Sequence, residues 1–355
     1  MFKILQRTSL KTIELDYSGE YRCINVDSIL VTRIRNLLNS IYHGGVRSGI
    51  YGYARKNENH ELNVVSFFRG FRPDFNHGNY EEVISRYFHN YFEVGEKGKA
   101  YRENVLDDGI PTYFYDTPDS EEIDELLQLI NSILKKNNFG KIKPEKIRSL
   151  IEKDTLGTYM YLLNLAHNIG GRWENKCRSP FVSASYGSKG FETALRFAQA
   201  RNTDINSYVI WGFTNINDSG NYIFTKELSR NLGMMNVNWY EDIHSEIIIK
   251  DSIAPQNILG VFEINNETSA KQFIINPSLY KLFYASKDMH RYKFSELVNY
   301  ICREGIPIDQ SNFMKCAREL GYKSYGYRLP NGQTFAGEID REANIRLPEN
   351  TNIWD

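Results

Sequence analysis

The chain has 355 residues, of which 41% are hydrophobic and 25% charged, so it can bury a full hydrophobic core and more than one. Its formal net charge of −1 gives no overall field that would draw it to a nucleic acid or a membrane. No apolar run approaches the roughly 18 residues of a membrane span. The N-terminal segment MFKILQRTSLKTIELDYSGE has too short an apolar core and lacks the cleavage site of a secretory signal. We expect no membrane partner and a location in the cytoplasm, or delivery into a target cell without a cleaved signal peptide.

Cysteine and histidine spacing argues against metal binding. Cys23, Cys177, Cys302 and Cys316 are scattered without a CxxC pair, which is typical of reduced thiols in a cytosolic fold. The seven histidines show no HExxH or other paired-ligand pattern, so we predict no metal site. The 24 tyrosines and 20 phenylalanines indicate thick cores or contacts with flat ligands, and composition alone does not separate the two.

Helical patterns alternate with one strand pattern in the first half of the chain. Residues 27–41 predict a helix with Asp27 as its N-cap, and the glycines of HGGVRSG predict its end. The segment ELNVVSFFRG predicts a strand that ends on Arg69 and Gly70, followed by the loop FRPDFNHG. Helices are predicted for NYEEVISRYFHNYF and for TPDSEEIDELLQLINSILKKNNFG, whose acidic first turn and closing lysines suit a helix dipole.

Short strands dominate the second half. Two more helical stretches, KPEKIRSLIEK and TYMYLLNLAHN, lead to a break at Gly170 and Gly171. Strand patterns follow in PFVSAS, SYVIWGF, SEIIIK and ILGVFEI, with the helix GFETALRFAQAR between the first two. After about residue 276 the chain is helical again, in PSLYKLFYA, RYKFSELVNYICREG and SNFMKCAREL, and it ends in a polar tail with the turn PNGQ.

These patterns predict an α+β protein with three segments. Residues 1–60 form an N-terminal helical and strand segment. Residues 61–275 form a β-rich body with a helical insertion at 117–170. Residues 276–355 form a helical C-terminal extension.

Three short polar motifs lie at the ends of predicted strands. FFRG places Arg69 at the end of an apolar strand. In FVSAS, Ser183 and Ser185 share one face of a strand because side chains alternate, and HSE places His244 and Glu246 together by the same rule. Each motif taken singly has an ordinary structural explanation, such as an arginine that extends to solvent or a glutamate that pairs with a lysine.

In their order and surroundings the motifs resemble the Arg–Ser–Glu class of mono-ADP-ribosyltransferases, which includes cholera-like and clostridial toxins and bacterial effectors. The family's arginine stands in an aromatic-Arg-Gly context, as in FFRG, and its Ser-Thr-Ser corresponds to residues 183–185. The family's catalytic glutamate falls on Glu246, and IAPQNIL is similar to the turn that follows it. The resemblance covers roughly 60–265. It implies a split β-sheet core of two packed antiparallel sheets, with 61–275 as the catalytic domain.

The resemblance implies that the protein moves ADP-ribose from NAD to a macromolecular acceptor and releases nicotinamide. Cleavage of the nicotinamide–ribose bond develops positive charge on the ribose, which glycosidases stabilise with carboxylates. Glu246 would stabilise this charge through the ribose 2′-hydroxyl, and Arg69 would hold the pyrophosphate or the neighbouring ribose. Ser183 would fix the geometry by hydrogen bonds to Glu246 and the nicotinamide ribose, with Ser185 as a further contact for NAD. Gly70 would leave room for the backbone to approach the nicotinamide amide.

Aromatic side chains near the Ser and Glu motifs are candidates to hold the nicotinamide ring. Phe191 and Phe197 follow the Ser strand, but their spacing in FETALRFA favours the core of a helix. Trp239 and Tyr240 lie in a Gly- and Asn-rich segment before Glu246 and are candidates for contact with NAD or the target.

His244 departs from the family pattern. Arginine-modifying members have a glutamate two residues before the catalytic one, and members that modify asparagine or some nucleobases have a glutamine. A neutral imidazole does not hold a guanidinium as a carboxylate does, so the sequence argues against an arginine target. His244 is a candidate general base or hydrogen-bond partner for a less basic acceptor. The alternative is a strand-end histidine bonded to backbone, and Asp242 would restore a carboxylate if the strand begins early.

The sequence does not decide whether the acceptor is a protein side chain or a nucleic-acid base. The insertion at 117–170 is a candidate recognition module or lid, and its lysines and arginines would suit a nucleic-acid backbone. Solvated helix faces look the same, and Glu145 and Glu152 dilute the basic character. A neutralising antitoxin or a chaperone is left open as a further partner.

Two other functions are compatible with the sequence. One is an NAD glycohydrolase on the same fold, with water as the acceptor. The other is a catalytically silent binding module that has kept the fold. A hydrolase of another class is disfavoured because the sequence has no GxSxG motif and no metal-ligand spacing.

Overall fold

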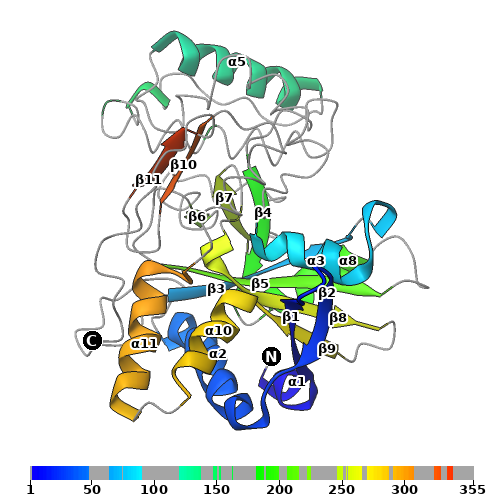
Figure 1. The fold of residues 1–355 in the computed structure, drawn as a ribbon. Coiled ribbons are helices and arrows are strands. Elements are labelled where there is room, and N and C mark those ends of the chain that lie inside the picture. Colours follow the sequence, from blue (N-terminus) through cyan, green and yellow to red (C-terminus); the bar gives the residue numbers. More distant parts are fainter. Residues whose placement is uncertain are drawn as a thin grey trace.

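The protein belongs to the α+β class, as the sequence predicts. The computed structural model describes residues 2–47, 64–73, 75–89, 120–136, 147–149, 152, 162, 181–187, 189–199, 206–215, 222–224, 246–250, 253, 255–265, 270–287, 291–307, 324–328 and 334–338. Nine strands form one sheet in the order β2-β1-β9-β8-β5-β3-β4-β7-β6 (Figure 1). The pairs are antiparallel except for β1 with β9, which is parallel.

The strands of this sheet are short, and several follow the predicted ranges closely. They are β1 (Ser9–Leu15), β2 (Tyr21–Asn25), β3 (Val64–Phe71), β4 (Phe181–Tyr186), β5 (Ser207–Asn215), β6 (Tyr222–Phe224), β7 (Glu246–Lys250), β8 (Ile258–Ile264) and β9 (Ala270–Ile275). The helices are α1 (Phe2–Arg7), α2 (Ser28–Arg47), α3 (Tyr80–His89), α5 (Ser120–Lys136), α8 (Gly190–Gln199), α10 (Pro277–Ala285) and α11 (Arg291–Glu304). Two single-turn helices, η1 (Phe75–His77) and η5 (Pro255–Asn257), precede α3 and β8.

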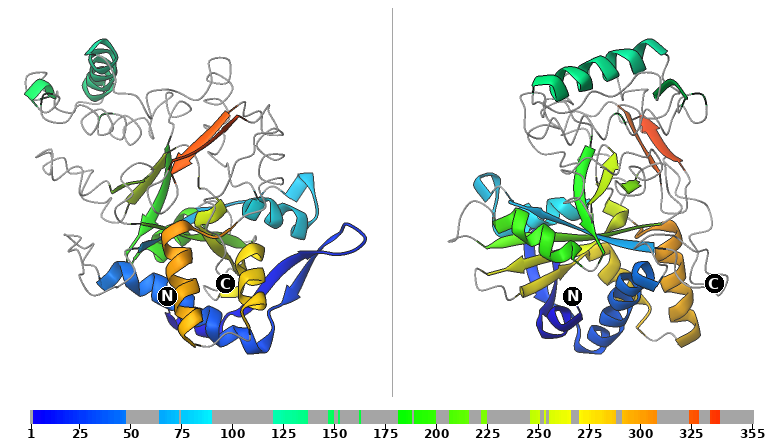
Figure 2. Two further views of the ribbon diagram at one scale, coloured as in Figure 1. Left: turned by 60° about the vertical axis from the view of Figure 1, so that its left-hand side comes forward. Right: turned by 180° about the vertical axis from the view of Figure 1, so that it is seen from behind.

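The sheet changes direction between β3 and β4. β3 pairs with β5 along its whole length, but its pairing with β4 is confined to Phe67 with Tyr186 and Phe68 with Ser185. Beyond Phe68 the two strands diverge, and we call this opening the fork. Strands β4, β7 and β6 form a wing that rises from the plane of the other six strands, the main sheet (Figures 1 and 2).

The wing folds back over one face of the main sheet. Val182 and Ile247 of the wing belong to the same buried hydrophobic cluster as Phe67 and Ile210 of the main sheet. Helix α3 closes this cluster from the same side with Ile84 and its neighbours. The predicted two packed sheets are therefore one hydrogen-bonded sheet folded on itself, because β3 pairs with both β5 and β4.

Helices cover the other face of the main sheet. Buried side chains of α1, α2, α8, α10 and α11 share one hydrophobic cluster with the strands. At its centre Trp211 is fully buried, and its indole N–H donates to Ser66 Oγ at 2.9 Å. The rings of Phe68 and Phe262 pack against Trp211 with centroids 5.7 and 6.0 Å away. The high aromatic content thus builds a thick core, in which each buried ring contributes on the order of 2–3 kcal/mol.

Helix α2 shows both a correct prediction and a wrong one. Asp27 caps its start by accepting a hydrogen bond from the amide of Ile29 at 3.0 Å. The predicted helix stops at residue 41, before HGGVRSG, whereas the observed helix runs through both glycines and ends at Arg47, inside that segment. Each glycine costs about 1 kcal/mol relative to alanine. The long apolar face that α2 buries, which includes Ile34 and Leu38, offsets this cost.

The N- and C-terminal segments share the sheet and the core with the body of the protein. β1 pairs with β9, and side chains of α10 and α11 lie in the same cluster as Phe68. The C-terminal extension is helical in α10 and α11, as predicted, but β10 (Ser324–Arg328) and β11 (Thr334–Glu338) form an antiparallel pair instead. Tyr325 and Tyr327 at alternate positions before PNGQ, and Phe335 after it, favour such a hairpin. The predicted helix SNFMKCAREL lies outside the described residues.

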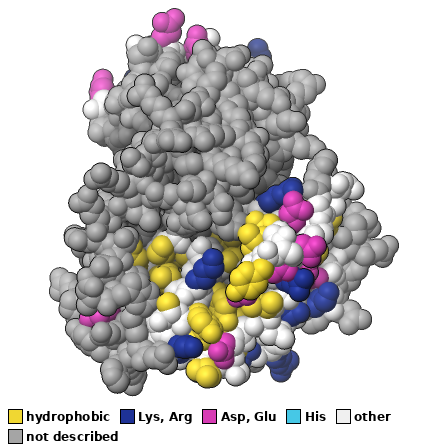
Figure 3. All heavy atoms as spheres, in the orientation of Figure 1, with side chains coloured by type: hydrophobic (Ala, Val, Ile, Leu, Met, Phe, Trp, Pro, Cys, Tyr) yellow, Lys and Arg dark blue, Asp and Glu magenta, His cyan; other side chains and the backbone are white. Residues whose placement is uncertain are grey.

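On the face shown in Figure 3, exposed hydrophobic side chains gather over the lower half, and acidic and basic side chains alternate along its margin. The exposed large hydrophobic residues of the N-terminal segment include Leu15, Tyr17 and Ile29. Within the described ranges, no helix is both long and apolar enough to cross a membrane.

Candidate functional site

The three polar motifs lie on three neighbouring strands. Arg69 is on β3, Ser183 and Ser185 are on β4, and Glu246 begins β7, and these strands are adjacent in the sheet order. In the register between β4 and β7, Ser185 lies directly opposite Glu246, while Ser183 lies opposite Ile248. Directly opposite residues of an antiparallel pair have Cβ atoms roughly 4.5–5.5 Å apart and side chains on one face. A hydroxyl and a carboxylate therefore stand side by side at this end of the wing.

Arg69 bridges the fork. It lies one residue beyond the last pairing of β3 with β4, and its Nη1 donates to the carbonyl oxygen of Ser183 at 2.5 Å. Its Nε is buried and has no hydrogen-bond partner among the described residues. A buried donor without a partner is costly, so this edge of the guanidinium fits an anionic oxygen such as that of a phosphate. Arg69 contacts the backbone of the Ser motif and not its hydroxyl groups.

The two serines share a face of β4, as predicted. Val182, Ala184 and Tyr186 point into the hydrophobic cluster between the wing and the main sheet. Ser183 and Ser185 therefore lie on the opposite face, where Ser185 is buried and Ser183 is partly buried. Apolar residues at every second position thus direct both hydroxyl groups away from the cluster between the wing and the main sheet.

The packing of α8 against β3 explains why residue 70 is a glycine. A Cβ atom at this position would lie 2.0 Å from the carbonyl oxygen of Ala194 and 2.8 Å from the amide nitrogen of Ala198, both on α8. Only glycine lets the backbone of α8 approach β3 this closely. The space that we expected to admit nicotinamide is therefore occupied by the helix. The same helix begins next to Ser185, whose carbonyl oxygen would lie 3.0 Å from a Cβ at Gly190.

The remaining predicted site residues divide into three groups. Glu246 is partly buried at the start of β7. Phe191 is buried in the core, as its spacing predicts, but Phe197 is 74% exposed on α8, so its assignment to the helix core is wrong. Phe197 falls on the solvent side of α8 because Ala194 and Ala198 occupy the side facing β3. His244, Trp239, Tyr240 and Asp242 lie outside the described residues.

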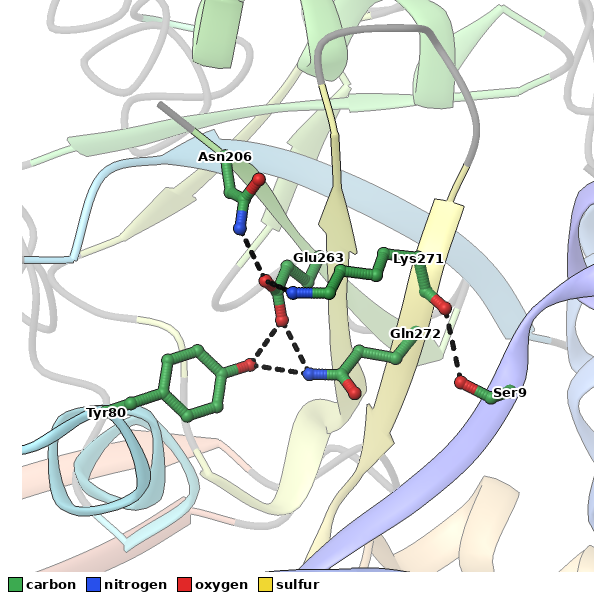
Figure 4. Close-up of polar contacts among 6 residues, drawn as sticks. All are labelled: Ser9, Tyr80, Asn206, Glu263, Lys271 and Gln272. Atoms are coloured by element: carbon green, nitrogen blue, oxygen red, sulfur yellow. Dashed lines mark hydrogen bonds and ion pairs between the residues drawn. The ribbon is translucent and has the colours of Figure 1, made fainter. Parts of the chain in front are cut away.

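Sequence reasoning missed a second carboxylate. Glu263 on β8 is only 2% exposed and accepts hydrogen bonds from four side chains (Figure 4). The sequence feature that could have identified Glu263 is its position as a single acidic residue inside the apolar run ILGVFEI. Among the described residues, no group of three or more His, Cys, Asp or Glu side chains could hold a metal ion. Cys23 and Cys302 are free thiols.

No protein-family model matches the sequence, and a search of curated proteins gives no match. Arg69 lies on the face of β3 that carries Phe67 and Phe71, and both serines lie on the other face of β4, so the guanidinium reaches the Ser motif across the fork through the backbone. Around β4 the described residues thus supply a guanidinium with one buried donor that has no partner among them, two serines on one strand face and, on β7, a carboxylate opposite Ser185. Such a set can bind a phosphate and stabilise positive charge that develops on a neighbouring sugar.

Proposed function

We propose that the protein is an NAD-dependent mono-ADP-ribosyltransferase that moves ADP-ribose from NAD to a protein side chain or a nucleic-acid base and releases nicotinamide. The observation that carries the proposal is the adjacency of β3, β4 and β7, with Ser185 opposite Glu246 and Arg69 bonded to β4. An ADP-ribosyltransferase-like fold and the role of a bacterial toxin or effector belong to the same proposal.

Each of the three motifs has a separate task in this proposal. Arg69 binds an oxygen of the NAD pyrophosphate through its Nε edge, while Nη1 keeps its bond to the Ser183 carbonyl. Glu246 accepts a hydrogen bond from the ribose 2′-hydroxyl, and this bond strengthens as the ribose becomes positive. Ser185 orients the Glu246 carboxylate from the neighbouring strand. The bond electrons leave with nicotinamide, and the acceptor nucleophile attacks the anomeric carbon and loses its proton.

The first experiment compares Glu246→Gln with the wild-type protein in nicotinamide release from NAD. Removal of one group that stabilises transition-state charge lowers kcat by about 100- to 1000-fold. We expect this loss with NAD affinity and unfolding midpoint close to the wild-type values. Glu14→Gln, an exposed carboxylate on β1, is the matched control and should keep full activity. Equal activity of Glu246→Gln and wild type would rule out the proposal.

A second experiment separates the transferase from its rivals. The wild-type protein is incubated with NAD labelled in the adenosine part and with separate protein, RNA and DNA fractions. Label on one fraction supports the transferase and identifies the class of acceptor. Nicotinamide release without labelled macromolecules would instead show an NAD glycohydrolase. Absence of both would show a silent binding module.

A further inference from the structure

A buried polar cluster lies on the main sheet, at the end of β8. Tyr80 and Gln272 donate to one carboxylate oxygen of Glu263, each at 2.6 Å. Asn206 and Lys271 donate to the other oxygen, at 2.6 and 3.1 Å. Gln272 also donates to the Tyr80 hydroxyl at 2.9 Å, so three side chains form a closed triangle (Figure 4). The carboxylate is therefore buried with both of its oxygens bonded, which offsets its desolvation.

A β-bulge builds this cluster. Glu263 pairs with Gln272, but the next residue, Ile264, pairs with Ala270, so Lys271 is an extra residue in β9. In a regular strand, Lys271 and Gln272 would point to opposite faces of the sheet. The bulge lets both side chains reach the same carboxylate, as Figure 4 shows. Bulges that redirect side chains in this way occur frequently next to active sites.

The cluster fixes the segment that follows Arg69. Tyr80 is the first residue of α3, so its bond to Glu263 ties the start of this helix to the main sheet. Phe75 of η1 stacks on the Tyr80 ring, with centroids 5.8 Å apart. It also meets Tyr208 edge-on at 5.8 Å. The chain from the end of β3 to α3 is thus held by rings that adjoin Glu263.

One of these rings, Tyr208, also contacts the strand that carries Arg69. Phe71 lies two residues after Arg69 on the same face of β3, and its ring contacts Tyr208 at 5.9 Å and Tyr87 of α3 at 4.5 Å. Tyr208 pairs with Phe71 on one side and with Glu263 on the other. A continuous path of packed side chains therefore connects the Glu263 carboxylate to Phe71, two residues beyond Arg69 at the end of β3.

We propose that Glu263 and Tyr80 are positioning residues for the NAD site, which hold α3 and the end of β3 so that Arg69 presents its guanidinium to the pyrophosphate. This inference rests on the proposed function. Arg69 contacts a part of NAD that does not react, so it binds the ground state and the transition state alike. Loosening its support therefore raises KM and leaves kcat almost unchanged.

The test compares Tyr80→Phe with Tyr280→Phe, which alters a buried tyrosine on α10 in the other hydrophobic cluster. Nicotinamide release is measured over a range of NAD concentrations with the full-length protein. Mutations along a coupled path change binding by roughly 2- to 30-fold. For Tyr80→Phe we expect a rise in KM for NAD of about tenfold with kcat within about twofold of wild type. Tyr280→Phe should keep the wild-type KM.

A second measurement tests the anchor without NAD. Hydrogen exchange of the α3 amides should be faster in Tyr80→Phe than in Tyr280→Phe, because the start of the helix has lost its tie to the sheet. Gln272→Met, which removes the shared donor but leaves the bond from Tyr80 to Glu263, should raise KM to a smaller extent. It provides the same test if Tyr80→Phe does not fold.

The outcomes separate this inference from the proposed function. If the wild-type protein cleaves NAD and Tyr80→Phe has the same KM as Tyr280→Phe, the positioning role is wrong and the proposed function stands. A fall in kcat at unchanged KM would also overturn the positioning role. If the wild-type protein neither binds nor cleaves NAD, the proposed function is wrong and the inference falls with it.

Discussion

Glu263 and Glu246 are carboxylates at the ends of strands in the two parts of the folded sheet, and their surroundings differ. Glu263, in the main sheet, is 2% exposed and accepts hydrogen bonds from Tyr80, Asn206, Lys271 and Gln272. Glu246, in the wing, is partly buried and stands opposite one small hydroxyl side chain at the fork. One carboxylate is enclosed by protein donors, and the other lies on β7 opposite Ser185, at the level of the last pair between β3 and β4.

The difference indicates that the carboxylate of the main sheet is structural and that the carboxylate of the wing is the candidate for chemistry. A carboxylate whose two oxygens are bonded by protein groups is held rigidly and contributes to the stability of the fold. A partly exposed carboxylate beside a serine is accessible to a ligand. The two-residue pairing between β3 and β4 joins the wing to the main sheet while leaving the edges of these two strands apart beyond Phe68.

The largest expected effect is on stability, in a matched pair of substitutions. Glu263→Ala leaves Tyr80, Gln272 and Asn206 with buried donors that lose their acceptor. Breaking such a buried charged cluster from one side costs about 3–5 kcal/mol. Glu246→Ala should cost about 1 kcal/mol or less, because its side chain is partly exposed. Urea unfolding of both variants measures the difference, and equal losses would show that the two regions do not differ.

Gly70→Ala tests whether the geometry of the fork depends on helix packing. The new Cβ would meet two backbone atoms of α8, which do not yield as a flexible side chain does. Overpacking of this kind costs about 1–3 kcal/mol, and we expect the upper end of this range. Gly19→Ala is the control, since its Cβ would meet nothing within 4 Å although its φ is +83°. That strain costs about 1 kcal/mol. A smaller loss at position 70 than at position 19 would contradict the close packing of α8 on β3.

Much of the local structure follows from the sequence, because it depends on patterns of neighbouring residues. The periodicity of α3 and α8 and the alternation in β4 identify these elements correctly. The position where α2 ends does not follow from the sequence pattern, because burial of its apolar face stabilises the helix by more than its two glycines destabilise it. Phe197 shows the same limit, since helical spacing does not reveal that the small side chains of α8 face the sheet.

The geometry of the site depends on contacts between distant residues. The motifs indicate that Ser185 and Glu246 are polar residues on strands, but their direct opposition depends on the register of β4 with β7. Glu263 stands out in the sequence only as one acid in an apolar strand. Its partners come from α3, the start of β5 and a bulge in β9, and no local pattern predicts that these elements meet.

Stability at alkaline pH should depend on the tyrosines around Glu263. Burial, and then the hydrogen bond to Glu263, raise the pKa of Tyr80 above the ordinary value of 10.0. Burial and the Glu263 charge also raise the pKa of Tyr208. Above pH 10 the unfolded chain loses these protons while the native protein keeps them. The stabilisation is therefore complete below pH 10 and is lost as the pH rises.

The change with pH can be measured by urea unfolding between pH 9 and pH 11. In Tyr80→Phe, the fall in unfolding free energy should be shallower than in wild type by up to about 1.4 kcal/mol per pH unit. Tyr17→Phe, at a fully exposed position, should show the wild-type slope. Parallel slopes for Tyr80→Phe and wild type would mean that the phenol is not protected by the Glu263 cluster.

The smallest expected effect is the loss of stability when Lys271, the exposed partner of Glu263, is replaced. The Lys271 side chain is 56% exposed, although the carboxylate that it pairs with at 3.1 Å is buried. Solvent screens the ammonium, and the three neutral donors from Tyr80, Asn206 and Gln272 remain when it is removed. Lys271→Met should therefore cost less than about 1 kcal/mol in urea unfolding and keep the methylene packing of the lysine stem. A loss as large as that of Glu263→Ala would show that the ion pair, and not the neutral hydrogen bonds, holds the buried carboxylate in place.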